Sequence, residues 1–314
     1  MKIKFQERKL INGETKILPI QVGDGSIIKL FDKTPYPKKE NDVVCPHFIE
    51  LKWANGCNFN CAWCYLNGTF RFRPNGKKPY AKNIEKVKSH LLSFFEQVKK
   101  PYVLNSGEIS DSLVFEGTEY AITKTIIPLF LQQDKHKLLI LTKSVDINDL
   151  LKVPSDKIIV SYSINAEEVA RRWEKAPSIE KRLKAISILQ SAGFEIRLRI
   201  DPLVSIENWK DCYGRLIEEM INKYEINPSR ITIGSLRGLQ TTIQHSLDKS
   251  WVVYLKESTN WGKRIDFDSR FKMYSFIIEK LEGEGIRSIA FCKETIKMWN
   301  SLGKDYKKIE CNCL

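Results

Sequence analysis

The chain has 314 residues, and 42% of them are hydrophobic, which is enough to build a full core in one large domain or two smaller ones. Lys and Arg exceed Asp and Glu to give a formal net charge of +13, and such a chain attracts polyanions, of which nucleic acid is the commonest. No apolar run approaches the ~18 residues of a membrane span, and the first residues lack an apolar signal core. We therefore expect no membrane association and a cytoplasmic location in which cysteines stay reduced.

Residues 1–46 precede the main pattern and predict a small β element of their own. Turn signals at 11–14 and 23–26 separate short apolar runs. We place one boundary after this N-terminal β-rich extension, a core over 47–245, and a C-terminal extension over 246–314.

A strand predicted over 48–54 leads into a loop with three cysteines in C-x3-C-x2-C spacing, namely Cys57, Cys61 and Cys64. Electron-transfer clusters usually have four protein thiolates, so three thiolates can hold a [4Fe–4S] cluster and leave one iron free to bind a small molecule. A structural zinc site usually takes four N or S ligands, and disulfide frameworks suit small secreted chains. We interpret the loop, with Trp63 before its last cysteine, as an iron–sulfur site.

A basic segment follows this loop directly. Residues 71 to 90 include seven Lys or Arg residues and only one acidic residue, Glu85. This excess of positive charge predicts phosphate contact beside the mouth of the site. Arg71 and Arg73 would bind phosphates, and Trp53, Tyr65 and Phe70 are aromatic side chains on which bases can stack. The alternative is a lysine-rich surface that only faces solvent.

From residue 48 onward, short β-branched runs alternate with helical patterns, which favours parallel β/α units. Six such units fit an open, partial (β/α)6 barrel. The expected strands cover 48–54, 102–107, 137–142, 157–164, 194–202 and 230–236, and the expected helices lie near 84–99, 118–133, 147–152, 178–192, 207–226 and 269–282.

Two of these strands alternate polar and apolar residues strictly. Period-2 patterning places Glu195, Arg197, Arg199 and Asp201 on one face, and Ser161, Ser163 and Asn165 share one face of the strand before it. In a barrel that face lines the lumen, so we predict a cavity for a polar ligand. An antiparallel sheet with one wet face would alternate in the same way.

Five cysteines lie outside the loop. Cys212 falls in a helical pattern and suits a buried apolar position. Cys45, Cys292, Cys311 and Cys313 flank the core, and they could bind a second [4Fe–4S] cluster or a zinc ion if the tail folds back to the start of the core. Ordinary core thiols, or a hydrogen-donating thiol in the tail, are the alternatives.

Several short motifs point to one family. They are the run Cys61 to Leu66, the pairs Ser110-Asp111 and Thr142-Lys143, the run Ser163-Ile164-Asn165, the set Glu174, Pro177 and Arg182, and the ending Cys311-Asn312-Cys313. The cysteine loop resembles that of the radical S-adenosylmethionine (SAM) superfamily. Most of residues 45–314 resembles spore photoproduct lyase and related DNA-repair proteins within it.

This resemblance implies that Cys57, Cys61 and Cys64 bind the cluster and that its free iron chelates SAM. Residues Trp63, Glu108, Ser110, Lys143, Ser163 and Arg199 are then the expected SAM-binding set, because Gly107-Glu108 is similar to the motif that holds the SAM amino group. Tyr65 would relay a radical or simply pack beside the cluster. Glu108 also occupies the position at which the repair lyase has its hydrogen-donor cysteine, so modification is an expected outcome as well as repair.

Three functional hypotheses follow. The first is an enzyme that takes one electron from a donor such as flavodoxin or ferredoxin, cleaves SAM to a 5′-deoxyadenosyl radical and abstracts hydrogen from nucleic acid. The second keeps this chemistry with a peptide or small metabolite as substrate. The third is a non-enzymatic metal–thiolate protein that binds nucleic acid. Salt-dependent nucleic-acid binding favours the first over the second, and an absence of SAM binding favours the third.

Overall fold

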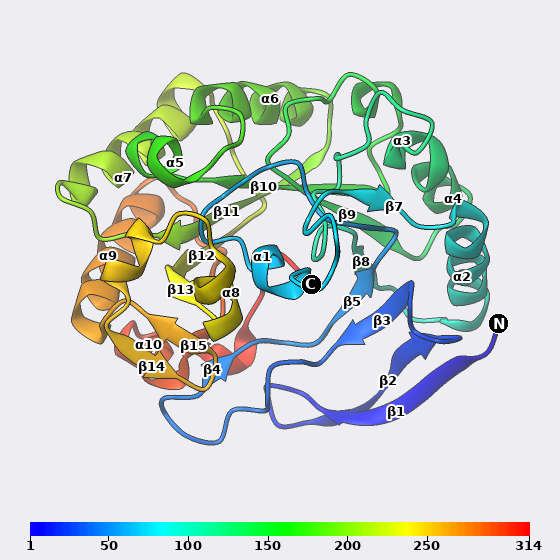
Figure 1. The fold of residues 1–314 in the computed structure, drawn as a ribbon, viewed down its shortest axis with the longest axis horizontal. Coiled ribbons are helices and arrows are strands. Elements are labelled where there is room, and N and C mark those ends of the chain that lie inside the picture. The colour runs from blue at the N-terminus through cyan, green and yellow to red at the C-terminus, as the bar shows by residue number, and fades with distance from the viewer.

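A ten-stranded sheet forms the core of the computed structural model, which describes residues 1–314 (Figure 1). Its seven strands from β5 to β16 are all parallel, which confirms the predicted β/α core. The two ends of this parallel section do not pair, so the barrel stays open. In spatial order the strands are β1 (Ile3–Lys9), β2 (Thr15–Val22), β3 (Ile28–Phe31), β5 (Phe48–Leu51), β8 (Val103–Asn105), β9 (Lys137–Thr142), β10 (Ile158–Ile164), β11 (Glu195–Leu203), β12 (Arg230–Ser235) and β16 (Ile289–Phe291).

The longer helices lie on the outer face of this curved sheet (Figure 1). Three of them begin at a side chain that accepts a backbone N–H of the first turn, namely Asn83, Ser178 and Asp266. None of the helices is both long and apolar enough to cross a membrane. The helices are α1 (Leu66–Thr69), α2 (Ile84–Gln97), α3 (Ile122–Thr125), α4 (Ile127–Leu131), α5 (Glu167–Trp173), α6 (Ile179–Ser191), α7 (Trp209–Glu218), α8 (Gln240–His245), α9 (Phe267–Gly283) and α10 (Ile296–Ser301).

Two expected helices differ in the structure. The pattern near 118–133 divides into α3 and α4, and the one near 147–152 is a single 3-10 turn over Leu150–Lys152. Pro128 at the start of α4 lacks the N–H that a continuous helix would need, which explains the first break. The pattern near 207–226 is α7 followed by a π-helical turn, Glu219–Lys223.

The three N-terminal strands form an antiparallel continuation of the main sheet. Strand β3 pairs with β5 from Ile28 opposite Leu51 to Phe31 opposite Phe48, and β1 forms the outer edge. The expected β element therefore exists and is built onto the core. The boundary at residue 46 remains a prediction about how the chain divides.

A short ladder bridges the open side of the barrel. Strand β4 (Val43–Val44), which precedes β5, pairs antiparallel with β17 (Glu294–Thr295), which follows β16. Buried Glu294 holds Arg264 and Arg270 beside this ladder. The remaining small sheets are β6 (Ala54–Asn55) with β7 (Tyr80–Ala81), and β13 (Arg237–Gly238), β15 (Gly262–Arg264) and β14 (Glu257–Thr259).

The C-terminal tail occupies part of the lumen that the strand pattern predicted for a ligand. Asn312 donates to Ser161 Oγ at 3.0 Å and to the Leu198 carbonyl at 2.8 Å, and it accepts from Thr232 Oγ1 at 2.8 Å. Arg197 donates to the Asn312 carbonyl at 3.1 Å. Part of the polar face of β10–β12 therefore binds the protein's own chain, while Ser163, Arg199 and Asp201 of the same face line a cavity, as the alternation predicts.

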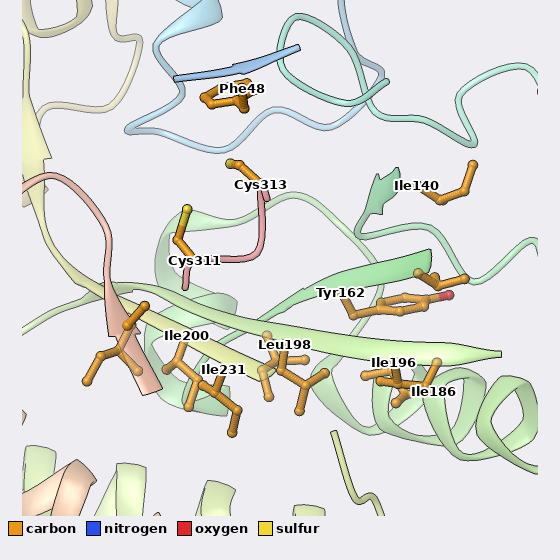
Figure 2. Close-up of a cluster of buried hydrophobic side chains, with 14 of the residues drawn as sticks. Phe48, Ile140, Tyr162, Ile186, Ile196, Leu198, Ile200, Ile231, Cys311 and Cys313 are labelled. Atoms are coloured by element: carbon orange, nitrogen blue, oxygen red, sulfur yellow. The ribbon is translucent and has the colours of Figure 1, made fainter. Parts of the chain in front are cut away.

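Figure 2 shows the two sides of these strands. Ile196, Leu198 and Ile200 point toward the outer helices, while Cys311 and Cys313 lie on the opposite, inner side. The C-terminus consequently lies inside the ring of strands and helices (Figure 1).

Replacing Asn312 tests how much the tail contributes to stability. In Asn312→Ala, Ser161 Oγ and the Leu198 carbonyl lose a buried donor and the Thr232 hydroxyl loses its acceptor, so we expect a loss of about 2–3 kcal/mol in the free energy of unfolding, measured in urea on metal-free protein. Asn300→Ala on α10 is the control, because this exposed side chain makes no hydrogen bond. Equal stability of both variants would show that the tail is not a structural part of the lumen.

Candidate functional site

One cavity of about 460 Å³ lies at the carboxyl ends of the parallel strands, where ligands bind in open α/β sheets. Every residue that the sequence analysis selected for the cluster, SAM, catalysis or a second metal lines it. These are Cys45, Cys57, Cys61, Trp63, Cys64, Tyr65, Glu108, Ser110, Lys143, Ser163, Arg199, Cys292, Cys311 and Cys313. Phe70, Arg71 and Arg73 lie outside it, and Trp53, expected to stack on bases, is fully buried. The fold therefore brings together side chains that are spread over most of the sequence, although their roles remain predictions.

The cysteine loop is held by backbone contacts on both sides. Gly56 donates to the Ile109 carbonyl at 2.9 Å, and Cys57 N donates to the Lys77 carbonyl at 2.9 Å. Gly56 has φ +89°, and a Cβ there would come within 2.4 Å of the Lys77 carbonyl oxygen. Only glycine permits this approach, and the approach sets the start of the loop.

The other end of the loop is fixed by the opposite wall of the barrel. Ala62 N donates to the Trp173 carbonyl at 2.8 Å, and Ser246 Oγ donates to the Ala62 carbonyl at 2.7 Å. Trp63 packs on Trp173 with ring centroids 5.7 Å apart. The loop is thus positioned for three thiols to face the cavity before any cofactor binds.

The segment after β8 places Ser110 beside the start of this loop, where it bridges Gly56, and Glu108 lines the same cavity. Gly107 lies so close to β9 that a Cβ would meet Leu141 Cβ at 2.4 Å. Asp111 is buried, and its carboxylate accepts from Thr142 Oγ1 at 2.7 Å and from Lys143 N at 2.8 Å. Burial raises the pKa of this carboxyl. Asp111 therefore joins the ends of β8 and β9, and it presents Lys143 to the cavity.

Lys143 belongs to a buried set of three charges. Its Nζ pairs with Glu174, whose other oxygen is 2.7 Å from Arg182, and it also lies 4.0 Å from Cys61 Sγ. Burial opposes ionisation of Glu174, but Lys143 and Arg182 together hold the pKa of its carboxyl below the ordinary value. The three motifs that contain these residues thus form one electrostatic unit next to the cysteine loop.

Some polar atoms in the cavity lack partners. The Tyr65 hydroxyl, Arg199 Nε and Thr242 Oγ1 are buried without a hydrogen bond, and the Glu108 carboxylate makes none within the chain. Buried polar groups are usually satisfied, so this wall suits a polar ligand that supplies the missing partners. Together with three thiols on one loop, these atoms fit a thiolate-bound cluster and SAM.

Three charged residues that line the cavity were not selected by the sequence analysis, namely Lys33, Arg237 and Lys293. Arg237 binds Asp201 through two hydrogen bonds of 3.0 and 2.9 Å. Lys293, at φ +48°, places Nζ 4.4 Å from the centroid of Phe31 and 4.2 Å from that of Trp261, without a carboxylate partner. Arg237 follows parallel strand β12 and Lys293 follows parallel strand β16. Ligand sites in such sheets lie at the carboxyl ends of the strands, and this rule could have identified both residues from the sequence.

Four of the five cysteines outside the loop line the cavity together with cationic side chains. Arg199 donates to Cys313 Sγ at 2.9 Å, Arg237 to Cys292 Sγ at 3.2 Å, and Lys293 to Cys45 Sγ at 3.5 Å. Nowhere do three or more His, Cys, Asp or Glu side chains lie close enough to hold a single metal ion, either here or at the cysteine loop. Cys212 is buried on α7, outside this lining, as expected.

An exposed ridge of cations and aromatic rings follows α1. Phe72 is 81% exposed, and the Arg71 guanidinium lies 3.9 Å from its ring centroid. Arg73 lies 4.8 Å from the Phe70 ring and 4.4 Å from the Tyr80 ring. We call these five residues the aromatic–basic ridge; four of them directly follow α1 and Tyr80 lies on β7, while the predicted phosphate contact stays a prediction.

Comparison with known proteins gives a consistent result. The family model "Spore photoproduct lyase" matches residues 47–249. The spore photoproduct lyase of Bacillus subtilis (strain 168) is 26% identical over 175 residues, which cover 54% of this chain and 50% of that protein. The enzyme of Geobacillus sp. (strain Y412MC61) is 25% identical over 182 residues, covering 55% and 50%. The chain thus spans about half the length of these curated relatives.

A solved structure has the same fold. A spore photoproduct lyase double mutant with bound AdoMet and dinucleoside spore photoproduct superimposes with a TM-score of 0.64 at 19% identity, covering 78% of this chain and 76% of that one.

The charge set at Lys143 predicts a specific pH dependence. Because the folded-state pKa of Glu174 is depressed, its contribution to stability is present above the unfolded value of about 4.3 and is lost as the pH falls through the folded value. Glu174→Gln should lower the free energy of unfolding of metal-free protein by about 3 kcal/mol at pH 7. The difference from wild type should shrink below about pH 4.3.

Glu168→Gln is the matched control, because this half-buried carboxylate on α5 pairs with exposed Arg215 and should cost about 1 kcal/mol or less. A Glu174→Gln effect that stays constant from pH 7 to pH 3 would contradict the assigned ion set.

Proposed function

This chain belongs to the spore photoproduct lyase family, and we propose that it is a radical SAM enzyme that acts on DNA. The observation that carries the proposal is the cavity in which Cys57, Cys61 and Cys64 face Glu108 and Lys143. When bound, the [4Fe–4S] cluster and SAM supply one-electron cleavage of the sulfonium and a carbon radical that can take hydrogen from an unactivated C–H bond.

The chain's own residues bind and orient these groups. Cys57, Cys61 and Cys64 hold the cluster, and Lys143, kept charged by Glu174, provides a fixed cation beside it. Glu108 and Ser110 are placed to accept and donate hydrogen bonds to the polar end of SAM. Partly buried Trp63 packs on buried Trp173, and together these rings would shield this side of the loop from water.

The aromatic–basic ridge supports nucleic acid as the substrate. Its guanidinium groups can neutralise phosphates, and exposed Phe72 offers a face on which a base can stack. A base inside a duplex must leave the stack to reach a cavity. The ridge begins directly after Thr69, which lines the cavity, so its rings could stack on such a base and lower the cost of that step.

The name of the relatives indicates the lesion to test first. A spore photoproduct lyase structure contains a dinucleoside spore photoproduct, so we propose thymine-derived lesions in DNA as the substrate class. Glu108 occupies the position of the family's hydrogen-donor cysteine. The product radical would therefore take hydrogen from another group, and Tyr65, which lines the same cavity, is a candidate.

The test begins with anaerobic reconstitution. With dithionite, SAM and an oligonucleotide that contains spore photoproduct, we expect 5′-deoxyadenosine and two restored thymines. Cys57→Ala, Cys61→Ala and Cys64→Ala should each abolish both products, and Cys212→Ala should leave them unchanged. Turnover of SAM without any change in DNA would favour a peptide or metabolite substrate. If the protein binds neither iron nor SAM, the proposal that it is a radical SAM enzyme is refuted.

The ridge makes a separate prediction about DNA binding. Phe72→Ala should weaken binding of single-stranded DNA by about 1–3 kcal/mol through lost stacking. Arg71→Ala should reduce the slope of log Kobs against log salt by about 1. Fluorescence anisotropy over a salt series measures both.

The control is Phe5→Ala, because this residue is also exposed (46%) but lies on edge strand β1. If Phe5→Ala and Phe72→Ala weaken binding equally, the ridge is not the DNA-binding surface.

A further inference from the structure

Four cysteines form a second thiol site in the same cavity as the cysteine loop. Cys45 precedes β5, Cys292 follows β16, and Cys311 and Cys313 belong to the tail, so three separate segments deliver them. The β4–β17 ladder brings the first two segments together, since Val44 pairs with Glu294. Figure 2 shows Cys311 and Cys313 between Phe48 and the strands that carry Leu198 and Ile200.

We propose that Cys45, Cys292, Cys311 and Cys313 bind a second [4Fe–4S] cluster. One thiolate per iron gives complete protein ligation, whereas the three-cysteine loop leaves one iron free. The proposed cluster would therefore not chelate SAM. It goes beyond the proposed function, because its binding does not depend on SAM cleavage or on the substrate.

The charges around these thiols match such a cluster. A [4Fe–4S] cluster with four thiolates is a net anion, and burying an anion requires cations and hydrogen-bond donors close to it. Arg199 contacts Cys313 at 2.9 Å, Arg237 contacts Cys292 at 3.2 Å, and Lys293 contacts Cys45 at 3.5 Å. Lys293 has no carboxylate partner, so its charge is available to the thiol site.

The four thiols do not surround a single point. Around a single ion all ligands meet at one point, but in a cubane each thiolate binds a different iron, so the sulfur atoms stand further apart. Neither this set nor the cysteine loop has the compact arrangement of a single-ion site. The arrangement therefore argues against a single zinc ion at the four outer thiols.

The position explains why the site would be built here. Cys45 and Cys292 lie on the two edges of the open barrel, and Cys311 and Cys313 lie on the tail that enters it. A cluster bound to all four would join both edges and the tail.

Iron content after anaerobic reconstitution tests the proposal. We expect about eight irons per chain in the wild type and about four in a variant with Cys57, Cys61 and Cys64 all changed to Ala. Cys311→Ala with Cys313→Ala should also leave about four irons, and Cys212→Ala should leave about eight.

Cys45→Ala with Cys292→Ala is a second double variant for the case in which the tail variant fails to fold. Electron paramagnetic resonance adds a readout other than activity. The reduced signal that remains in the triple variant should not change when SAM is added, while the signal in the tail variant should change.

About four irons in the wild type and none in the triple variant would overturn the second cluster and leave the proposed enzyme intact. Reaction of all four outer thiols with Ellman's reagent in reconstituted protein would also overturn it. If the triple variant retains iron while the wild type does not cleave SAM, the result would support the second cluster and refute the proposed function.

Discussion

The polar inner faces of β10, β11 and β12 are buried, and the rest of the structure depends on how they are satisfied. Unpaired polar groups in a dry interior cost about 1–3 kcal/mol each. Asn312 meets this requirement for Ser161 and Thr232, and Arg197 and Arg230 donate to carbonyl groups of the tail. The remaining polar groups, nearer the carboxyl ends of the strands, surround the cavity. The tail thus fills one part of the lumen with protein and leaves the other part open as the cavity.

The same sheet turns separate sequence motifs into one site. Ser110-Asp111 follows β8 and Thr142-Lys143 follows β9, and the Asp111 carboxylate binds both Thr142 and Lys143. Glu174 then joins Lys143 to Arg182 at the cysteine loop. These residues belong to separate short motifs in the sequence, but in the fold Asp111 positions Lys143, and Lys143 in turn pairs with Glu174. A substitution at Asp111 or Glu174 would therefore act on the cavity through Lys143.

Much of this could be predicted, because it follows from local patterns. Period-2 and helical runs located the parallel strands, and C-x3-C-x2-C spacing selected the three thiols. Long-range pairing left no such local signal. The tail's place in the lumen, the ladder between β4 and β17, and Lys293 between Phe31 and Trp261 all depend on contacts that no local pattern contains. Period 2 in β11 identified the polar face correctly, but could not tell that Asn312 would cover it.

The way in which the tail is bound has a consequence for the order of folding. Its side-chain hydrogen bonds to the strands join residues 80 to 208 positions apart, from the Thr232 contact of Asn312 to the Asn105 contact of Cys313. Contacts of such long range form more slowly than the pairing of strands that are neighbours along the chain. We therefore expect the parallel strands to pair before residues 311–313 enter the lumen, so that the interior is accessible to small ions in that interval.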